Sequence, residues 1–441
     1  MREIYVDEIF ANGKMTKYVI SIFLATFFAA ACNGFTLKMY GVLVGNMMGD
    51  MGISPATAGM IGSVTFYGMF LGSITLGALS TKFGSKNCAM FAMCLTIISS
   101  VVMATTDSIT VLIMFRALTG FGVAGFLPCN FSYVGEYMPV RYRPILISLS
   151  ASGVPVGTII SSLVGVNFLA QVGWRGMFMM QTVLILPLIL YFFYNPPSIT
   201  YCMKKGWQDR LVKVTAKAHP EMYTPQEGDV MVATPVNTVK ATLSMLFKNG
   251  LARNTILYWI TYFFIMLYDY GLATWLPSIL VAMNYNLTTG LLMLMVNSVG
   301  AIIGQFTISS ICAKRRFFRI PLICAFAVSG GCLIPLMFSP PVAIVTILIF
   351  IAGLTNQGIV GTMNAYCTTN YPLPLRPMSI GSSLGFSRFG GSFGSMLGGW
   401  LLASAVASEM NFLVFACCAF AGLIFVSLIK DRTREFSAEA Q

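Results

Sequence analysis

The stretch GFGVAGFLPCNFSYVGEYMPVRYRP, at residues 120–144, has a counterpart at residues 353–377, GLTNQGIVGTMNAYCTTNYPLPLRP. Glycine, tyrosine, proline and arginine residues coincide in the two stretches at a constant offset of 233 residues. A repeat at a fixed offset predicts two structurally similar halves. The coinciding pairs are Gly120 and Gly353, Gly125 and Gly358, Tyr133 and Tyr366, Pro139 and Pro372, Arg143 and Arg376, Pro144 and Pro377, and, just beyond the stretches, Gly157 and Gly390.

Long apolar runs surround both stretches. Each run can form a helix that crosses a bilayer, which needs about 20 residues. With six runs in each half, we expect an all-α membrane protein of twelve transmembrane helices in two pseudo-symmetric six-helix bundles. The runs begin near Tyr18, Ala56, Cys88, Val111, Ile145 and Gly176, and then near Asn254, Gly290, Ile320, Val342, Met378 and Asn411.

The composition excludes a soluble protein. Of the 441 residues, 56% are hydrophobic and 10% are charged, whereas a soluble domain has about 25% charged residues. The mean hydropathy of +0.78 agrees. The eleven cysteines lie mostly within apolar runs and lack the spacing of metal ligands, so we interpret them as small core residues. We therefore expect neither a metal nor another cofactor.

A polar stretch separates the two halves. It extends from about Asn195 to Arg253 and contains the single histidine, His219, and eight Lys and Arg residues. We expect a first bundle at residues 1–194, a cytoplasmic linker at 195–253 and a second bundle at 254–441. The charged start leads directly into a full-length span, so we expect no cleavable signal peptide.

The basic residues predict the orientation. Of the 27 Lys and Arg residues, 23 fall in alternate connections between the runs, and by the positive-inside rule these connections, the linker and both termini face the cytoplasm. The net charge of +12 thus reflects orientation rather than a nucleic-acid partner. Outside the linker, these residues include Lys14, Lys17, Lys82, Lys86, Arg141, Arg143, Lys314, Arg315, Arg316, Arg319, Arg376, Lys430, Arg432 and Arg434.

Two parallel repeats of spans joined by a cytoplasmic linker are typical of a secondary transporter. In such a protein the substrate binds between the halves near the middle of the bilayer, and access alternates as one bundle rocks against the other. Gly-rich segments in the spans favour close helix packing rather than phosphate binding.

Four charged residues lie within the predicted spans: Lys38, Arg116, Asp269 and Arg388. A charge within the bilayer costs at least about 2.5 kcal/mol, so each of them is a candidate functional residue. Three cations against one carboxylate favour an anionic substrate, and the planar guanidinium of Arg388 can bind a carboxylate with two hydrogen bonds. We expect Arg388 to be the main carboxylate ligand, with Lys38 as a second contact.

Each charge also has a structural alternative. Arg116 can bind helix carbonyls, Lys38 can extend to the membrane surface, and Arg388 can be purely structural. Asp269 can be either a coupling residue or a fixed counter-ion. Further candidates for substrate binding are polar or aromatic side chains, which more often serve packing: Asn33, Tyr270, Gln357 and Tyr366.

The chain resembles the major facilitator superfamily over nearly its whole length, and two motifs carry the resemblance. GALSTKFGSK at residues 77–86 is similar to its cytoplasmic gate motif, with Thr81 in place of the usual Asp, and RALTGFGVAG at residues 116–125 is similar to its fourth span. The resemblance implies the major facilitator fold, in which spans 1, 4, 7 and 11 line the central cavity. It also implies a gating role for Gly77, Lys82, Gly84, Lys86, Glu136 and Arg143.

Within the superfamily, the chain resembles the aromatic acid:proton symporters. The similar features are NGFTLKMYG at residues 33–41, Trp174-Arg175, Trp275-Leu276-Pro277, Tyr371-Pro372 with Arg376, and Arg388 with Gly390. That family carries two acids in span 1 for proton-coupled uptake, whereas this chain has Asn33 and Thr36 at those positions.

The sequence therefore predicts a secondary active transporter of a small organic anion, aromatic or another carboxylate, in the bacterial cytoplasmic (inner) membrane. Its partners are the substrate, the lipid bilayer and either protons or a counter-anion, and we expect a monomer. The loss of the span 1 acids leaves an anion exchanger or a uniporter as the alternative. A non-transporting sensor is a weaker hypothesis, and the spans lack the His/Asp/Glu cluster of an enzyme.

Overall fold

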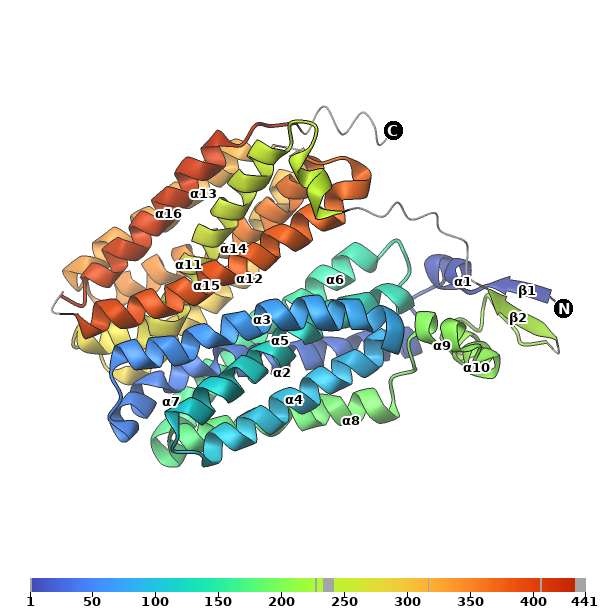
Figure 1. Ribbon diagram of the computed structural model, residues 1–441, viewed down its shortest axis with the longest axis horizontal. Helices are drawn as coiled ribbons and strands as arrows, with labels where there is room; N and C mark the ends of the chain where they lie inside the picture. Colours follow the sequence, from blue (N-terminus) through green and yellow to red (C-terminus); the bar gives the residue numbers. More distant parts are fainter. Residues whose placement is uncertain (1, 227, 233–241, 316, 405–406, 433–441) are drawn as a thin grey trace.

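The computed structural model describes residues 2–226, 228–232, 242–315, 317–404 and 407–432. Arg316 and Arg434, which contribute to the charge asymmetry, lie outside the described residues. The described chain is almost entirely helical, and its helices are arranged in two bundles (Figure 1).

The first half forms one bundle and the second half forms the other. The first bundle comprises α2 (Lys17–Met51), α3 (Pro55–Phe83), α4 (Ser85–Thr105), α5 (Ile109–Tyr137), α6 (Arg143–Ala151), α7 (Gly153–Met180) and α8 (Ile185–Phe193). The second comprises α11 (Ala252–Ala282), α12 (Leu287–Arg315), α13 (Arg319–Leu333), α14 (Val342–Thr369), α15 (Arg376–Ala403) and α16 (Met410–Leu428). Short 3-10 turns are found at Gln181–Leu184, Leu243–Phe247, Ile334–Phe338 and Leu373–Leu375.

Ten helical segments in the described residues are long and apolar enough to cross a membrane. One of them, Ile145–Phe193, has 49 residues and contains a chain reversal at Gly173, whose φ of +63° a residue with a Cβ would rarely adopt. Helix α15 is outside the ten because Ser and Gly residues lower its hydropathy. Large apolar side chains such as Leu24, Phe192 and Ile347 are exposed on the outer surface, as expected of a protein embedded in lipid.

The internal repeat is visible in the helix packing. Gly120 brings α5 against α3, since a Cβ there would lie 1.9 Å from the carbonyl oxygen of Thr65. Gly353 brings α14 against α12 in the same way, since a Cβ there would lie 2.1 Å from the carbonyl oxygen of Asn297. The guanidinium groups of the repeat also match: Arg143 donates to Met138 O and Arg376 donates to Tyr371 O, each five residues earlier. The predicted similarity of the two halves is therefore confirmed at these positions.

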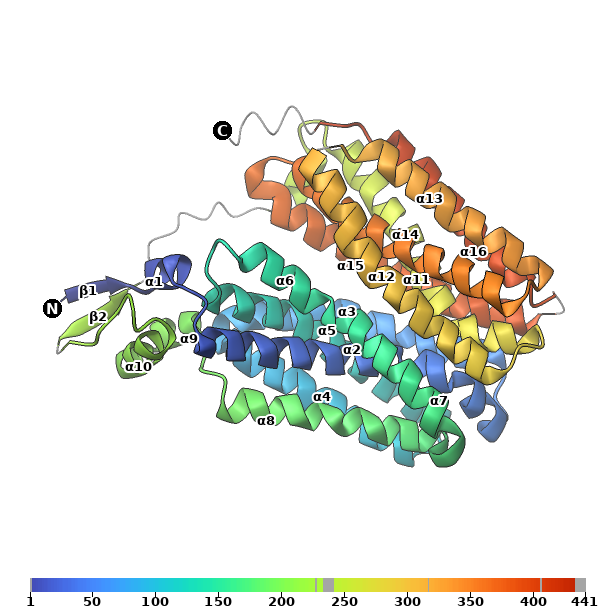
Figure 2. The same cartoon turned by 180° about the vertical axis from the view of Figure 1, so that it is seen from behind.

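The two bundles meet at one end and diverge at the other, the end that carries both termini (Figures 1 and 2). We call these the far end and the terminal end. At the far end α2 touches α11 because Gly41 lacks a side chain: a Cβ there would lie 2.6 Å from Ala273 O. Helices α3 and α15 meet similarly, where a Cβ at Gly399 would lie 2.5 Å from Pro55 O. The far end is therefore closed by helix-to-helix contact.

A small folded unit lies at the terminal end, beyond the bundles. It contains β1 (Arg2–Tyr5), α1 (Val6–Asn12), α9 (Ile199–Lys205), α10 (Gln208–Ala218) and β2 (Asp229–Val232). The strands are parallel, from Arg2 opposite Asp229 to Tyr5 opposite Val232. The sequence predicted only a polar linker here, because four-residue strands that pair across more than 200 residues leave no local pattern.

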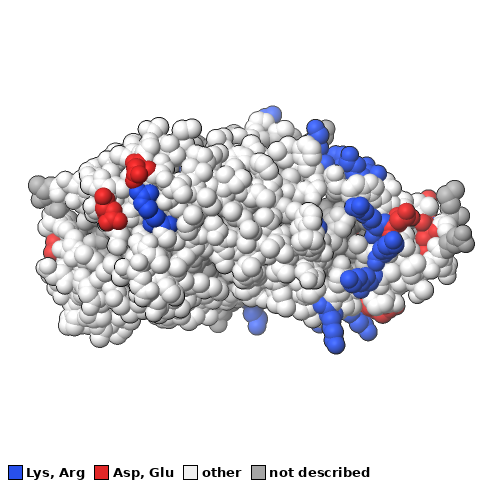
Figure 3. Space-filling view, turned by 90° about the horizontal axis from the view of Figure 1, so that it is seen from below, with Lys and Arg blue, Asp and Glu red and all other residues white. Residues whose placement is uncertain are grey.

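The charged side chains follow the same division. In the face that Figure 3 shows, Lys and Arg gather toward the terminal end, while the middle of the molecule is almost free of charge. At the far end, Arg175 donates to Thr106 O at 3.0 Å and pairs with Asp107, which joins two turns of the first bundle. The ten long apolar segments are those of an integral membrane protein.

Candidate functional site

A cavity of about 250 Å³ lies between the bundles. Helices α2, α6 and α7 of the first bundle line it together with α11, α12, α14 and α15 of the second. Its polar lining residues are Lys38, Thr158, Asp269, Tyr270, Asn297, Ser298, Gln305, Gln357, Asn364, Ser387 and Arg388. Five of the predicted site residues thus line one cavity, from four helices: Lys38, Asp269, Tyr270, Gln357 and Arg388.

Lys38 and Asp269 form an ion pair across the cavity. The Lys38 Nζ lies 3.7 Å from Asp269 Oδ2, and the two side chains are 16% and 11% exposed. The ammonium also lies 4.2 Å from the centre of the Tyr270 ring. Because Lys38 belongs to α2 and Asp269 to α11, this pair joins the two bundles.

Asn356 fixes the carboxylate from the other side. Its Nδ2 donates to Asp269 Oδ1 at 2.6 Å, from helix α14. Asn356 was not among the predicted site residues, although it adjoins Gln357, which was. Its amide side chain within an apolar run, next to Gln357, was the sequence feature that could have identified it.

Arg388 has a different environment from Lys38. It is half-buried on α15 and lines the same cavity, and within the described part of the chain it has neither a hydrogen bond nor an ion pair. With Lys38 compensated by Asp269, the lining of the cavity carries one unbalanced positive charge. A half-buried guanidinium that faces a cavity without a counter-ion attracts negative charge, so this cavity has an electrostatic preference for a monovalent anion.

The remaining wall of the cavity is apolar. Met266, Leu294 and Leu384 come from three helices of the second bundle, and Val154 and Pro155 come from α7 of the first. A cavity with an apolar wall and one uncompensated cation suits a ligand with a carboxylate and a hydrophobic body.

Arg116 lies in a second, smaller cavity toward the far end. Tyr40, Thr65, Arg116 and Ser395 line it, and Lys38 and Tyr270 line both cavities. The Arg116 guanidinium lies 4.4 Å from the centre of the Tyr40 ring. The sequence grouped Arg116 with Arg388, but the structure places the two in separate cavities.

Two other predicted site residues are not in the lining of either cavity. Asn33 is buried within α2, and its Oδ1 has no hydrogen-bond partner in the part of the chain that the structure describes. Tyr366 is buried in the second bundle, with its ring stacked at 5.6 Å on Phe318 and 5.7 Å from the ring of Tyr258. The aromatic surroundings of Tyr366 are those of a packing residue.

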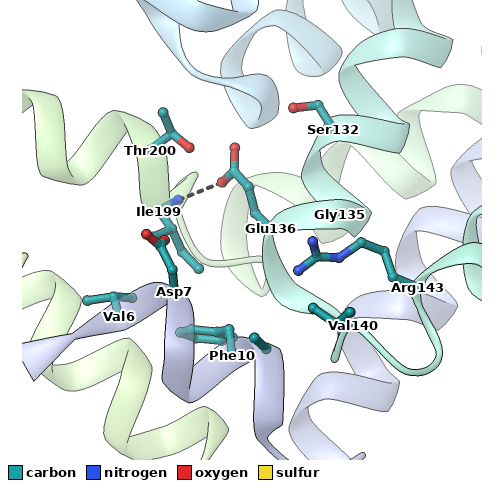
Figure 4. A pocket seen from close by; sticks show the side chains of 11 residues that line it. Val6, Asp7, Phe10, Ser132, Gly135, Glu136, Val140, Arg143, Ile199 and Thr200 are labelled. Atoms are coloured by element: carbon teal, nitrogen blue, oxygen red, sulfur yellow. Dashed lines mark hydrogen bonds between the residues drawn. The ribbon is translucent and has the colours of Figure 1, made fainter. Parts of the chain in front are cut away.

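The predicted gate residues all lie at the terminal end. Glu136 points toward the start of α9 beside a pocket of about 460 Å³ (Figure 4). Its carboxylate accepts a hydrogen bond from Ile199 N at 2.7 Å and another from Ser198 Oγ at 2.9 Å. Glu136 therefore caps a helix of the terminal unit, and Arg143, which lines the same pocket, holds the turn after α5.

The other gate residues surround the turn between α3 and α4. Gly84 forms this turn with a φ of +87°, and a Cβ there would lie 2.9 Å from Tyr201 Cβ. The ammonium of Lys86 donates to Asn195 O at 2.7 Å, which holds the chain after α8. Lys82 is exposed in the last turn of α3, and Gly77 lies one and a half turns before it in the same helix. These residues link the first bundle to the terminal unit.

His219 is the titratable group at the centre of the terminal unit. Its side chain is fully buried, with the ring 4.9 Å from that of Phe10 and Nδ1 3.5 Å from Glu221 Oε1. Burial lowers the pKa of His219 below its usual 6.5, and the carboxylate of Glu221 partly opposes this shift. The histidine is therefore neutral at pH 7.

Two helical bundles around a central cavity with buried charges define a membrane transport protein. The chain belongs to the Major Facilitator Superfamily, whose family model matches residues 26–381. The predicted resemblance to this superfamily is confirmed.

The chain is similar to transporters of aromatic acids. It is 30% identical to a benzoate transport protein of Acinetobacter baylyi in an alignment of 443 positions, which covers 98% of this chain and 94% of that protein. It is 24% identical to a gallate transporter of Pseudomonas putida, with 94% and 92% covered. The family and these relatives are membrane transporters, not enzymes.

Solved structures agree in fold. The inward open conformation of the xylose transporter XylE from E. coli has a TM-score of 0.72 at 16% identity, with 96% of this chain and 99% of that chain covered. A bacterial homolog of the human lysosomal transporter Spinster, in an inward-facing conformation, has a TM-score of 0.71 at 15% identity, with 96% and 98% covered.

Proposed function

We propose that the protein is a secondary transporter that carries a small aromatic carboxylate, such as benzoate, by alternating access. The observation that carries the proposal is the uncompensated Arg388 in a cavity where Lys38 already has a counter-ion. The benzoate and gallate transporters among the relatives support the same class of substrate.

In this proposal Arg388 binds the carboxylate and the apolar wall holds the ring. The guanidinium donates two parallel hydrogen bonds, which fix the orientation of the carboxylate plane. Met266 and Leu384 contact the hydrophobic body, and Gln357 and Tyr270 are available for ring substituents. Lys38 adds attraction and becomes a direct ligand when Asp269 releases it.

The arrangement of the bundles supports an orientation of the protein in the membrane and a state of the transport cycle. The closed far end faces the outside and the open terminal end faces the cytoplasm, so the protein is inward-facing with both termini cytoplasmic. The chain crosses the inner membrane of a bacterium twelve times as a monomer. Its bundles comprise residues 1–194 and 254–441, joined by the linker 195–253.

Asp269 is the coupling residue if transport is proton-driven, because no other carboxylate of the described residues lines the cavity. Protonation of Asp269 would break its ion pair with Lys38, which would free the ammonium for the substrate and unlink the bundles at this point.

Anion exchange or uniport is the second candidate, and the first helix favours it. Asn33 and Thr36 are buried and uncharged, and Thr36 Oγ1 donates to Cys32 O of its own helix at 3.2 Å. Neither side chain can take up a proton from solution. In exchange, the carboxylate of the incoming anion competes with Asp269 for Lys38.

Proteoliposomes with the purified protein test both candidates. Labelled benzoate is offered under an inward proton gradient, or with unlabelled benzoate inside and no gradient. Accumulation driven by the gradient supports symport, and stimulation by internal anion alone supports exchange. Transport of xylose or a quaternary ammonium in place of benzoate, or no carboxylate transport under either condition, contradicts the proposal.

A further inference from the structure

The second cavity contains a buried cation for which the proposed transport cycle assigns no function. Arg116 is 3% exposed, and its Nε and Nη1 have no hydrogen-bond partner among the described residues. The Tyr40 ring faces the guanidinium, and the Tyr40 hydroxyl donates to Ala58 O at 2.5 Å. A cation–π contact offsets part of the desolvation of a guanidinium, but it leaves the N–H groups unsatisfied.

The charge in this cavity is not balanced by the lining. The residues that line it carry two cations, Lys38 and Arg116, and no carboxylate. Asp269 compensates Lys38 from the neighbouring cavity. Arg116 therefore has no counter-ion in this lining. Because buried charges in proteins are paired or bind ions, Arg116 is a candidate for binding an anion.

Two hydroxyl groups beside Arg116 also lack partners. Thr65 Oγ1 and Ser395 Oγ are buried, and neither makes a hydrogen bond in the described part of the chain. Thr65 belongs to α3 of the first bundle and Ser395 to α15 of the second. Unsatisfied N–H and O–H donors from both bundles that line one small space are the ligands that an anion requires.

The size of the cavity limits the anion. Its free volume of about 20 Å³ holds an occupant no larger than one or two water molecules. The far end is closed over it, where a Cβ at Gly62 would lie 2.5 Å from Ser395 Oγ. An aromatic acid does not fit here in this conformation, whereas a monatomic halide does.

We propose that this second cavity is an occluded halide site, in which chloride bridges the Arg116 guanidinium and the hydroxyls of Thr65 and Ser395. Since these ligands come from both bundles, the bound anion stabilises the closed far end. The site is independent of the identity of the transported substrate.

The test measures the melting temperature of the full chain in detergent while chloride or bromide replaces gluconate at constant ionic strength. We expect a saturable rise with both halides. Thr65→Val keeps the shape and the charge of the site and should weaken halide binding about tenfold, since one hydrogen bond to a charged group is lost. Arg116→Gln should abolish the halide effect, and Arg175→Gln, at an exposed position of the far end, should leave it unchanged.

A benzoate titration separates this site from the substrate cavity. Arg388→Gln should lose the shift that benzoate produces and keep the shift that chloride produces. A chloride shift that persists unchanged in Thr65→Val and Ser395→Ala contradicts the halide site, even where Arg116→Gln fails to fold. No halide effect on the wild-type chain contradicts it too, as does a benzoate shift that depends on Arg116 in the absence of any halide shift.

Discussion

The two cavities between the bundles each contain an arginine, which is half-buried in one and almost fully buried in the other. Arg388 lies in a cavity of about 250 Å³ with an apolar wall, where a carboxylate with a ring can reach it. Arg116 lies in a space of about 20 Å³ under the closed far end, where only a small ion can. The number of charges in the membrane therefore predicts an anion, whereas the space around each charge limits the size of that anion.

The largest expected effect follows from removing the guanidinium of the large cavity. Arg388→Ala should lower the affinity for benzoate about 100-fold, since a lost bidentate contact to a charged group costs about 2–3 kcal/mol. Arg388→Lys keeps the charge without the planar fork, so its affinity for benzoate should lie between those of the wild type and of Arg388→Ala. Uptake into proteoliposomes at varied benzoate concentration measures both. Unchanged affinity in Arg388→Ala would remove this residue from the site.

The next effect concerns the ion pair shared by the bundles. Asp269→Asn leaves Lys38 without its counter-ion and should raise the affinity for benzoate about tenfold, because a second cation becomes available. The variant should also lose any dependence of uptake on the proton gradient and retain exchange. Asp107→Asn, at the exposed far end, is the matched control. A gradient dependence equal to that of the wild type would exclude Asp269 as the coupling residue.

A third prediction addresses the closure that separates the cavities. Gly41→Ala places a Cβ 2.6 Å from Ala273 O, and such overpacking costs about 1–3 kcal/mol. The far ends should move apart and the outward-facing state should become more populated. Gly49→Ala in the same helix has no atom within 4 Å of its Cβ and serves as the control. The reaction rate of a cysteine introduced at Thr274 with an impermeant thiol reagent measures the opening, and equal rates in the two variants would contradict this role of Gly41.

The smallest effect concerns a buried group outside the membrane. The pKa of His219 is lowered in the folded protein and is about 6.5 in the unfolded chain. Above pH 6.5 the imidazole is neutral in both states, so its titration does not lower the free energy of unfolding. This free energy decreases as the pH falls below that value and the unfolded form gains the proton. Hydrogen exchange of α1 and α10 should therefore rise between pH 7.5 and 5.5 relative to the transmembrane helices, after correction for the intrinsic rate. His219→Gln should remove this dependence, and a dependence that survives the substitution would place its origin elsewhere.

The sequence predicted the repeated framework well because the repeated residues make the same kind of contact in each half. Gly120 and Gly353 permit the same helix contact, and Arg143 and Arg376 donate to carbonyls five residues away. The cavity cations were also predictable, since charge is rare in an apolar span. The aromatic acid resemblance is confirmed by the relatives.

Other features depend on distances that a sequence does not contain. Arg116 on α5 and Arg388 on α15 line different cavities, which their positions in the sequence do not reveal. Asn356, Thr65 and Ser395 are common residue types in membrane helices, so their type alone did not mark them. The pairing of β1 with β2 joins residues more than 200 positions apart.

The anchoring of the two chain ends has a practical consequence. Strand β1 holds the start of the chain to the terminal unit of the first bundle, through Glu136 and α9. The other end is held to the second bundle, since Lys430 N donates to Asn254 Oδ1 at 3.1 Å and Arg432 N donates to Asn370 Oδ1 at 2.7 Å. A pair of fluorophores at positions 3 and 430 would thus report the distance between the bundles by energy transfer, and could follow single molecules as they open and close.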